Sequence, residues 1–111
     1  MEEERILPIG SVVVLKGEKQ YKVMIFARYM VTNFWDGPRY YEYGGCFYPE
    51  GLVTDKLVNF NFEDIEEVLH EGFIDEDEVK EQNRLRSWFA NDKIKRISVE
   101  EAMMVKQQMS N

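Results

Sequence analysis

Residues 11–31 read SVVVLKGEKQYKVMIFARYMV, and this stretch decides the fold. Ser11 to Lys16 is rich in β-branched residues and lies between two glycines, which predicts a strand. Gly17 to Gln20 has the length of a hairpin loop and leads into a second predicted strand, Tyr21 to about Val31. Both alternating faces of this second strand carry apolar side chains, so we expect it to bend across a core rather than lie flat on it.

A third strand is predicted to return alongside the second. The cluster NFWDGPR, Asn33 to Arg39, predicts a turn, because Asp-Gly-Pro is strong turn punctuation. Tyr40 to Tyr48 then reads as a strand that Pro49 to Gly51 closes. The pair Gly44-Gly45 inside it predicts a bulge or a sharp bend.

The next segment is less regular. Leu57 to Phe62 is a fourth extended stretch, and Glu63 to Ile65 is compatible with one helical turn. Glu67 to Phe73 could form a strand or prolong a helix. We favour a strand, because its first residues are compatible with a β conformation and its Gly-Phe end is typical of a strand end.

The C-terminal third predicts helices. Asp75 to about Asn91 contains neither Pro nor Gly and begins with acidic residues, which are favourable at a helix N-terminus. Lys93 to Ile97 is expected to be a connector or an edge strand. Ser98 and Glu101 have the spacing of a capping box, which predicts a second helix from Val99 to about Met109.

These segments predict an α+β fold. We expect a small antiparallel curved sheet, or an SH3-like barrel, of four to six strands followed by one or two C-terminal helices. The length of 111 residues suits one domain, residues 1–111, with the sheet over about residues 7–74 and the helical part over about residues 75–109.

Charge is concentrated in one part of the chain. The net charge is −7, which argues against nucleic-acid binding, because that requires clustered Lys and Arg. Between Glu63 and Glu81 there are ten acidic residues and one lysine, whereas the rest of the chain carries a net charge of +2. The acidity is therefore a local feature that could attract a basic partner.

The sequence shows no pattern of a catalytic or metal site. The single cysteine, Cys46, excludes an internal disulfide and suits a reducing compartment, and the single histidine, His70, excludes a His-rich metal site. An EF-hand loop starting at Asp75 fails, because Lys80 and Arg86 occupy its Gly and Glu positions. The longest apolar run, Val12 to Leu15, is too short to cross a bilayer. We therefore expect no enzyme activity, no cofactor and no membrane insertion.

Aromatic side chains gather in the middle of the chain. Seven lie within fifteen residues, and a chain of this size is not expected to enclose all of them: Phe34, Trp35, Tyr40, Tyr41, Tyr43, Phe47 and Tyr48. Tyr and Trp are favoured at binding hot spots, although packing within a curved sheet would also use them. The sequence predicts a partner-binding face that combines aromatic and acidic side chains: Trp35, Tyr41, Tyr43, Tyr48, Asp75, Glu76, Asp77 and Glu78.

The order of these elements resembles a family of small proteins of unknown function. The blocks LPIGSVV at residues 7–13 and YPEG at residues 48–51 carry the resemblance, and further matching blocks include Tyr43-Gly44-Gly45, Glu63-Asp64-Ile65 and Glu71-Gly72-Phe73. The resemblance covers about Leu7 to Glu78. It is to the domain-of-unknown-function family number forty-one seventy-six, whose members occur in Gram-positive bacteria beside type VII secretion genes and LXG-type toxins.

The resemblance implies a cytoplasmic accessory protein. Trp35-Asp36-Gly37 satisfies the bare WxG pattern of small exported helical hairpins, but here it lies between strand-like segments, so we interpret it as a turn. The accompanying export signal requires a tyrosine in a C-terminal helix, and no Tyr follows Tyr48. The protein is therefore expected to stay in the cytoplasm.

The leading hypothesis is a non-catalytic adaptor or chaperone-like protein that binds an LXG-type toxin or another secretion component. The first alternative is an immunity protein that blocks a toxin's active site. The second is an enzyme that uses scattered carboxylates such as Glu42, Glu50 or Asp64, which would require these groups to converge in a pocket. The sequence identifies neither the partner nor the oligomeric state.

Overall fold

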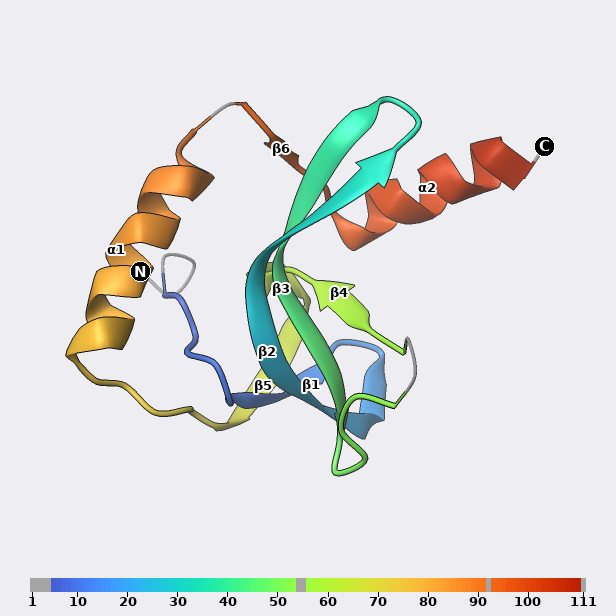
Figure 1. Cartoon of the computed structure of the whole chain (residues 1–111). Helices are drawn as coiled ribbons and strands as arrows, with labels where there is room; N and C mark the ends of the chain where they lie inside the picture. Colours follow the sequence, from blue (N-terminus) through green and yellow to red (C-terminus); the bar gives the residue numbers. More distant parts are fainter. Residues whose placement is uncertain (1–4, 54–55, 92, 111) are drawn as a thin grey trace.

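The computed structural model describes residues 5–53, 56–91 and 93–110, and it describes no side chain beyond Val105. Five strands come first and are followed by two helices, α1 and α2, with the short strand β6 between the helices, as Figure 1 shows. In chain order the elements are β1 (Val12–Leu15), β2 (Glu18–Phe34), β3 (Gly37–Tyr48), β4 (Val58–Phe60), the 3-10 turn η2 (Phe62–Asp64), β5 (Ile65–His70), α1 (Glu76–Phe89), β6 (Lys95–Arg96) and α2 (Val99–Ser110).

The strands form one strongly curved sheet. Its order is β4-β3-β2-β1-β5 with antiparallel neighbours. The short β6 pairs in parallel with β3 at Arg39 and Tyr40, close to the turn between β2 and β3. The long β2–β3 hairpin extends beyond the other strands, while β1, β4 and β5 gather at its lower end in Figure 1. The expectation of an α+β fold with a curved antiparallel sheet and C-terminal helices is confirmed.

The bend of the sheet lies at the paired glycines. Ile25 pairs with Gly45 and Ala27 with Gly44, so Phe26 is an extra residue on β2. A Cβ on Gly45 would lie 2.6 Å from a methyl group of Val23, a distance that real Cβ atoms do not reach. The predicted bulge is therefore present, but its extra residue is on β2, and the glycines of β3 allow the two strands to approach.

The main core lies inside the curve. Its buried members come from the segment before β1 and from four strands: Leu7, Val13, Val23, Ile25, Tyr43 and Phe60. The hydroxyl of Tyr43 accepts a hydrogen bond of 3.0 Å from the backbone N–H of Leu7. Burial raises the pKa of Tyr43 to about 12, so the phenol is neutral and can serve as a fixed polar contact within the core.

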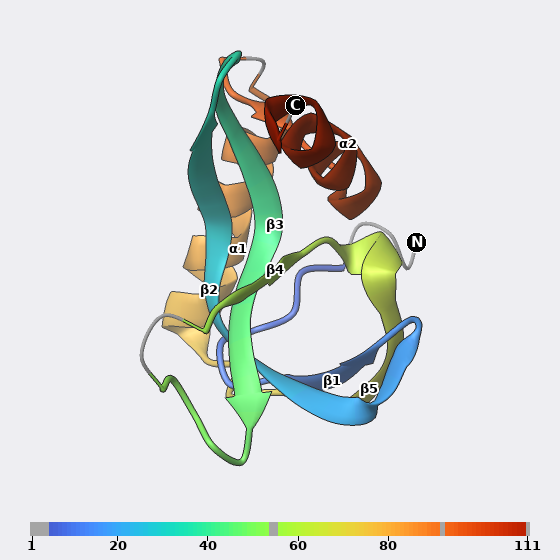
Figure 2. The same cartoon turned by 90° about the vertical axis from the view of Figure 1, so that its right-hand side faces the viewer.

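The two helices cover opposite faces of the distal part of the β2–β3 hairpin (Figure 2). On one face, Tyr40 stacks on Phe89 of α1 with ring centroids 5.6 Å apart. On the other face, Tyr41 packs with Ile97 and with Ala102 of α2. Neighbouring residues of a strand point to opposite faces, so Tyr40 contacts α1 and the adjacent Tyr41 contacts α2.

Several element boundaries differ from the sequence prediction. The hairpin between β2 and β3 turns at Trp35 and Asp36, so most of the predicted turn Asn33–Arg39 is strand. The strand favoured over Glu67 to Phe73 is present but spans Ile65–His70, so the expectation that Gly72 and Phe73 form its end is wrong. The predicted capping box is present, because Ser98 Oγ accepts from the N–H of Glu101 at 3.0 Å and the Glu101 carboxylate accepts from the N–H of Ser98 at 3.1 Å.

Candidate protein-binding surfaces

The expectation that Tyr41 and Tyr43 lie on an accessible face is wrong. Tyr41 is 6% exposed and Tyr43 is 2% exposed. Both point to the concave side of β3, where α2 covers Tyr41 and the main core encloses Tyr43. Neither side chain can contact a partner in this conformation.

Trp35 and Tyr48 are accessible but do not belong to one face. Trp35 is 65% exposed at the hairpin tip, and Tyr48 is 48% exposed at the opposite end of β3. A strand of 12 residues spans up to about 40 Å, so the two side chains are far apart. The predicted aromatic face is therefore divided into two separate places.

The acidic run is divided as well. Asp75 is the N-cap of α1 and accepts a hydrogen bond of 3.0 Å from the N–H of Glu78. Glu76 and Asp77 are exposed in the first turn. Glu78, in contrast, turns inward to Arg28 of β2, and their side chains are only 10% and 6% exposed.

The pair of Arg28 and Glu78 attaches α1 to the sheet. Arg28 Nη2 donates to Glu78 Oε1 at 2.9 Å, Nη1 donates to the second carboxylate oxygen, and Nη1 also donates to the carbonyl of Leu7 at 3.1 Å. Burial raises the pKa of Glu78, but the hydrogen bonds from Arg28 and Gln82 outweigh it and hold the pKa below its usual value. Glu78 is therefore a charged anchor of the fold.

The segment before α1 is fixed against the start of β1. A Cβ on Gly72 would lie 2.1 Å from the carbonyl oxygen of Ile9, so only glycine fits at this contact. The N–H of Gly72 donates to Ser11 Oγ at 3.0 Å, and that hydroxyl donates to the carbonyl of Pro8 at 2.8 Å. Two of the blocks that carry the family resemblance, LPIGSVV and EGF, are therefore held together by this close contact and these hydrogen bonds.

The next residue after this contact, Phe73, is exposed to solvent. Phe73 is 80% exposed, more than any other large apolar side chain of the described residues. It lines an open depression of about 500 Å³ together with one apolar and four acidic residues: Ile9, Asp75, Asp77, Glu78 and Glu81. We call these six residues the Phe73 surface. In the sequence, Phe73 stands out only as the end of the predicted strand Glu67 to Phe73 and as part of the block Glu71-Gly72-Phe73, because the contact of Gly72 with Ile9 that exposes it joins distant residues.

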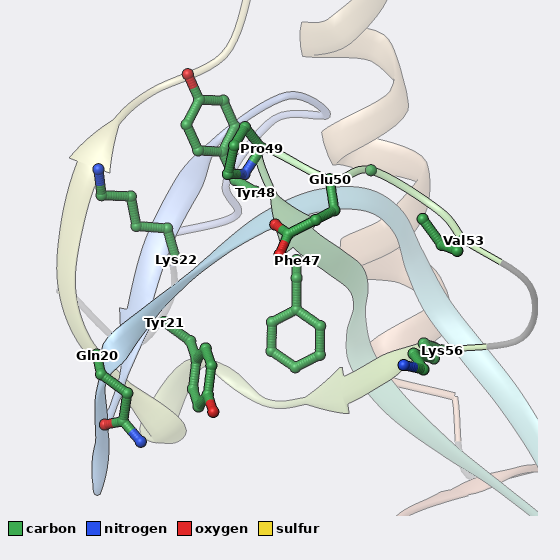
Figure 3. Close-up of a pocket in the computed structure, with 10 residues that line it drawn as sticks. Gln20, Tyr21, Lys22, Phe47, Tyr48, Pro49, Glu50, Val53 and Lys56 are labelled. Carbon is green, nitrogen blue, oxygen red and sulfur yellow. The ribbon is translucent and has the colours of Figure 1, made fainter.

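A second depression lies near the end of β3 (Figure 3). It is a groove of about 740 Å³ between the start of β2, the end of β3 and the loop after β3. The rings of Tyr21 and Phe47 lie 5.3 Å apart in it, and the ammonium group of Lys22 lies 5.8 Å from the ring centre of Tyr48. Lysines and Glu50 both line the groove, so its charge does not favour one class of partner.

The free edge of β5 is a poor template for strand addition. Val12 and Val13 pair with His70 and Val68, so Leu69 is an extra residue, and Glu66 is another. Two bulges and the exposed carboxylates of Glu66 and Glu67 interrupt this edge. These features are typical of strands that avoid edge-to-edge pairing.

Two of the three candidate catalytic carboxylates accept hydrogen bonds from backbone N–H groups. Glu42 accepts from the N–H of Phe62 at 2.8 Å, and Asp64 accepts from the N–H of Asn61 at 2.8 Å. Burial raises the pKa of Asp64. Glu50 lies apart from them in the groove of Figure 3. Among the described residues, no group of three or more His, Cys, Asp or Glu side chains could hold a metal ion.

Comparison with protein families decides the classification. The family model for a domain of unknown function, DUF4176, matches residues 6–80. The chain belongs to this family. The match contains every residue of the Phe73 surface except Glu81, together with Arg28, and it ends within α1. Comparison with curated proteins and with solved structures gives no match.

Neither helix of the described part of the chain combines the length and the apolar composition that crossing a bilayer requires.

Proposed function

We propose that this DUF4176 protein is a non-catalytic accessory protein of the cytoplasm that binds a type VII secretion partner, an LXG-type toxin or another component, through its Phe73 surface. The observation that carries the proposal is Phe73, the most exposed large apolar side chain within the described part of the chain, on a fixed backbone segment among carboxylates. The secretion context comes from the family resemblance.

The geometry is that of a binding hot spot. An aromatic side chain on a fixed backbone loses little conformational freedom when it enters a partner's pocket, because few of its bonds can rotate. Gly72 and the Asp75 cap fix the backbone on both sides of Phe73. Phe73 is therefore expected to act as the anchor and the surrounding charges as the rim.

The rim defines the chemistry of the partner. Asp75, Asp77 and Glu81 surround the anchor, and the region from Glu63 to Glu81 has a net charge of −9. Charges of this kind mainly raise the association rate and fix the orientation. The expected partner segment carries an apolar pocket flanked by Lys or Arg, and its binding weakens at high salt.

The test is co-expression with an LXG-type toxin divided into its N-terminal region and its C-terminal catalytic domain. We expect the N-terminal region to co-purify with the wild-type chain. Phe73→Ala should weaken this binding by about 2 kcal/mol, roughly 30-fold, because a hot-spot anchor is lost. Binding that Phe73→Ala leaves unchanged would exclude the Phe73 surface.

A charge reversal tests the rim. Asp77→Lys should slow association and reduce its dependence on salt, while Glu18→Lys, an equal change at an exposed residue of β2, should not. If the two variants associate at the same rate, the acidic rim does not steer the partner.

The immunity alternative predicts a different fragment. An inhibitor would bind the C-terminal catalytic domain and would rescue growth of cells that express this domain. Binding to the catalytic domain with rescue of growth would replace the adaptor proposal.

A further inference from the structure

We infer that the face of the β2–β3 hairpin beneath α2 is a docking site for an amphipathic helix of the protein partner, and that α2 is its intramolecular occupant. We call this face the α2 seat; its residues are Met30, Phe34, Arg39 and Tyr41. The inference deepens the proposed function, on which it rests for the identity of the partner.

Among the side chains of α2 that the structure describes, Val99 to Val105, those that pack on the hairpin are small. Ala102 and Val99 pack on the cluster of Tyr41 and Ile97, with Met30 and Phe34 beside them. An alanine and a valine bury little apolar area, so their contribution to the attachment is small. On its outer side α2 exposes Met103 and Met104, which are 59% and 58% accessible.

The connector before α2 is held independently of the helix. The N–H of Ile97 donates to the carbonyl of Tyr40 at 2.9 Å, and the carbonyl of Ile97 accepts from the side chain of Asn61 at 2.9 Å. β6 also pairs with β3 at this place. The connector can therefore stay in position while α2 leaves the seat, with Ser98 as the joint.

Arg39 indicates that α2 is an imperfect occupant. Its Nε atom is buried and has no hydrogen-bond partner within the described part of the chain. Its Nη2 donates to the carbonyl of Arg96 at 2.9 Å, but its contacts with the carboxylates of Glu101 and Asp36 are long, 3.4 Å and 3.5 Å, compared with 2.7–2.9 Å for a good charge-assisted hydrogen bond. A better placed carboxylate would form two parallel hydrogen bonds with this guanidinium group.

These features define the occupant. The seat accepts small or branched apolar side chains spaced three residues apart on a helix, as Val99 and Ala102 are, plus a carboxylate toward Arg39. An amphipathic helix that offers both would displace α2, because the tethered helix satisfies Arg39 only in part. Helix-in-groove recognition uses anchors with this spacing.

The test uses the full chain with Ala102→Glu, which places a charge in the seat, and Met103→Glu as a matched control on the exposed side of α2. A synthetic peptide of residues 98–110 is added, and the amide NMR signals of Phe34 and Tyr41 are followed. We expect the peptide to restore the wild-type signal positions in Ala102→Glu and to change nothing in Met103→Glu. Signals of a folded Ala102→Glu chain that do not respond to the peptide would overturn the inference.

The second measurement is the affinity for the N-terminal toxin fragment. Ala102→Glu should raise this affinity about tenfold or more, because the tethered helix no longer competes. An unchanged affinity in Ala102→Glu, with Phe73→Ala still weakening binding, would refute the α2 seat and leave the proposed function standing. If Phe73→Ala binds the fragment as tightly as the wild-type chain does, the proposed function is refuted instead.

Hydrogen exchange of the wild-type chain decides the question even if Ala102→Glu does not fold. We expect the amides of α2 to exchange through an opening that leaves β2 and β3 protected. Exchange of α2 only together with the hairpin, or a dimer in light scattering that exchanges α2 between copies, would contradict the inference.

Discussion

The two C-terminal helices lie on opposite faces of one hairpin but are attached to it differently. α1 is fixed by the buried ion pair of Glu78 with Arg28 and by Leu85, which is 2% exposed. α2 is fixed by Ala102 and Val99 and by a long surface ion pair of Glu101. The comparison teaches that two helices predicted with equal ease from sequence can be attached in different ways, α1 through a buried ion pair and α2 through small apolar side chains.

The largest expected effect tests the attachment of α1. Glu78→Gln leaves the positive charge of Arg28 buried without its counter-charge, so the free energy of unfolding should fall by about 3–5 kcal/mol. The control is Glu76→Gln, two residues away and exposed, which should change it by less than about 0.5 kcal/mol. Urea denaturation followed by circular dichroism measures both. Equal effects of the two substitutions would show that α1 does not depend on the ion pair.

The same ion pair predicts a pH dependence. Because the pKa of Glu78 in the folded chain lies below its usual value of 4.5, its charge stabilises the fold fully above that value. This contribution is lost as the pH falls through the lowered pKa. The difference in unfolding free energy between wild type and Glu78→Gln should therefore be constant near neutral pH and shrink below about pH 4.5. A difference that stays constant down to pH 2 would mean that Glu78 is not the group involved.

Much of this fold could be predicted from the sequence. β-branched runs and the capping box of Ser98 and Glu101 are local signals, and the structure contains the elements they indicate; Asp-Gly-Pro marks the hairpin, although its turn lies one residue earlier, at Trp35 and Asp36. The position of the bulge could be predicted, but its extra residue could not, because Gly44 and Gly45 affect the strand opposite them. Which strand carries the extra residue depends on contacts between strands.

The helix caps should show a smaller and more selective effect. Asp75→Ala and Ser98→Ala each remove one capping hydrogen bond, and each should cost about 1 kcal/mol. We expect Asp75→Ala to lower the global unfolding midpoint and Ser98→Ala to lower only the hydrogen-exchange protection of α2. If Ser98→Ala lowers the midpoint equally, the two helices belong to one cooperative unit and the contrast between them fails.

The candidate binding surface was harder to predict than the fold. Aromatic density could not separate Tyr41, which α2 covers, from Trp35, which nothing covers, because the covering residues lie about sixty positions later in the chain. The acidic run gave no sign that Glu78 alone would turn inward to Arg28. Phe73 is exposed because Gly72 and Ile9 meet, and no local pattern encodes that contact.

The smallest expected effect concerns Trp35. Trp35→Ala should change the free energy of unfolding by less than about 0.5 kcal/mol, because the side chain is 65% exposed in the turn between β2 and β3. It should also leave the toxin fragment bound as tightly as the wild-type chain does. Affinity measurements on Trp35→Ala and Phe73→Ala, both truncations of exposed aromatic residues, separate the two ends of the molecule. A stronger loss in Trp35→Ala would move the binding surface from the N-terminus of α1 to the hairpin tip.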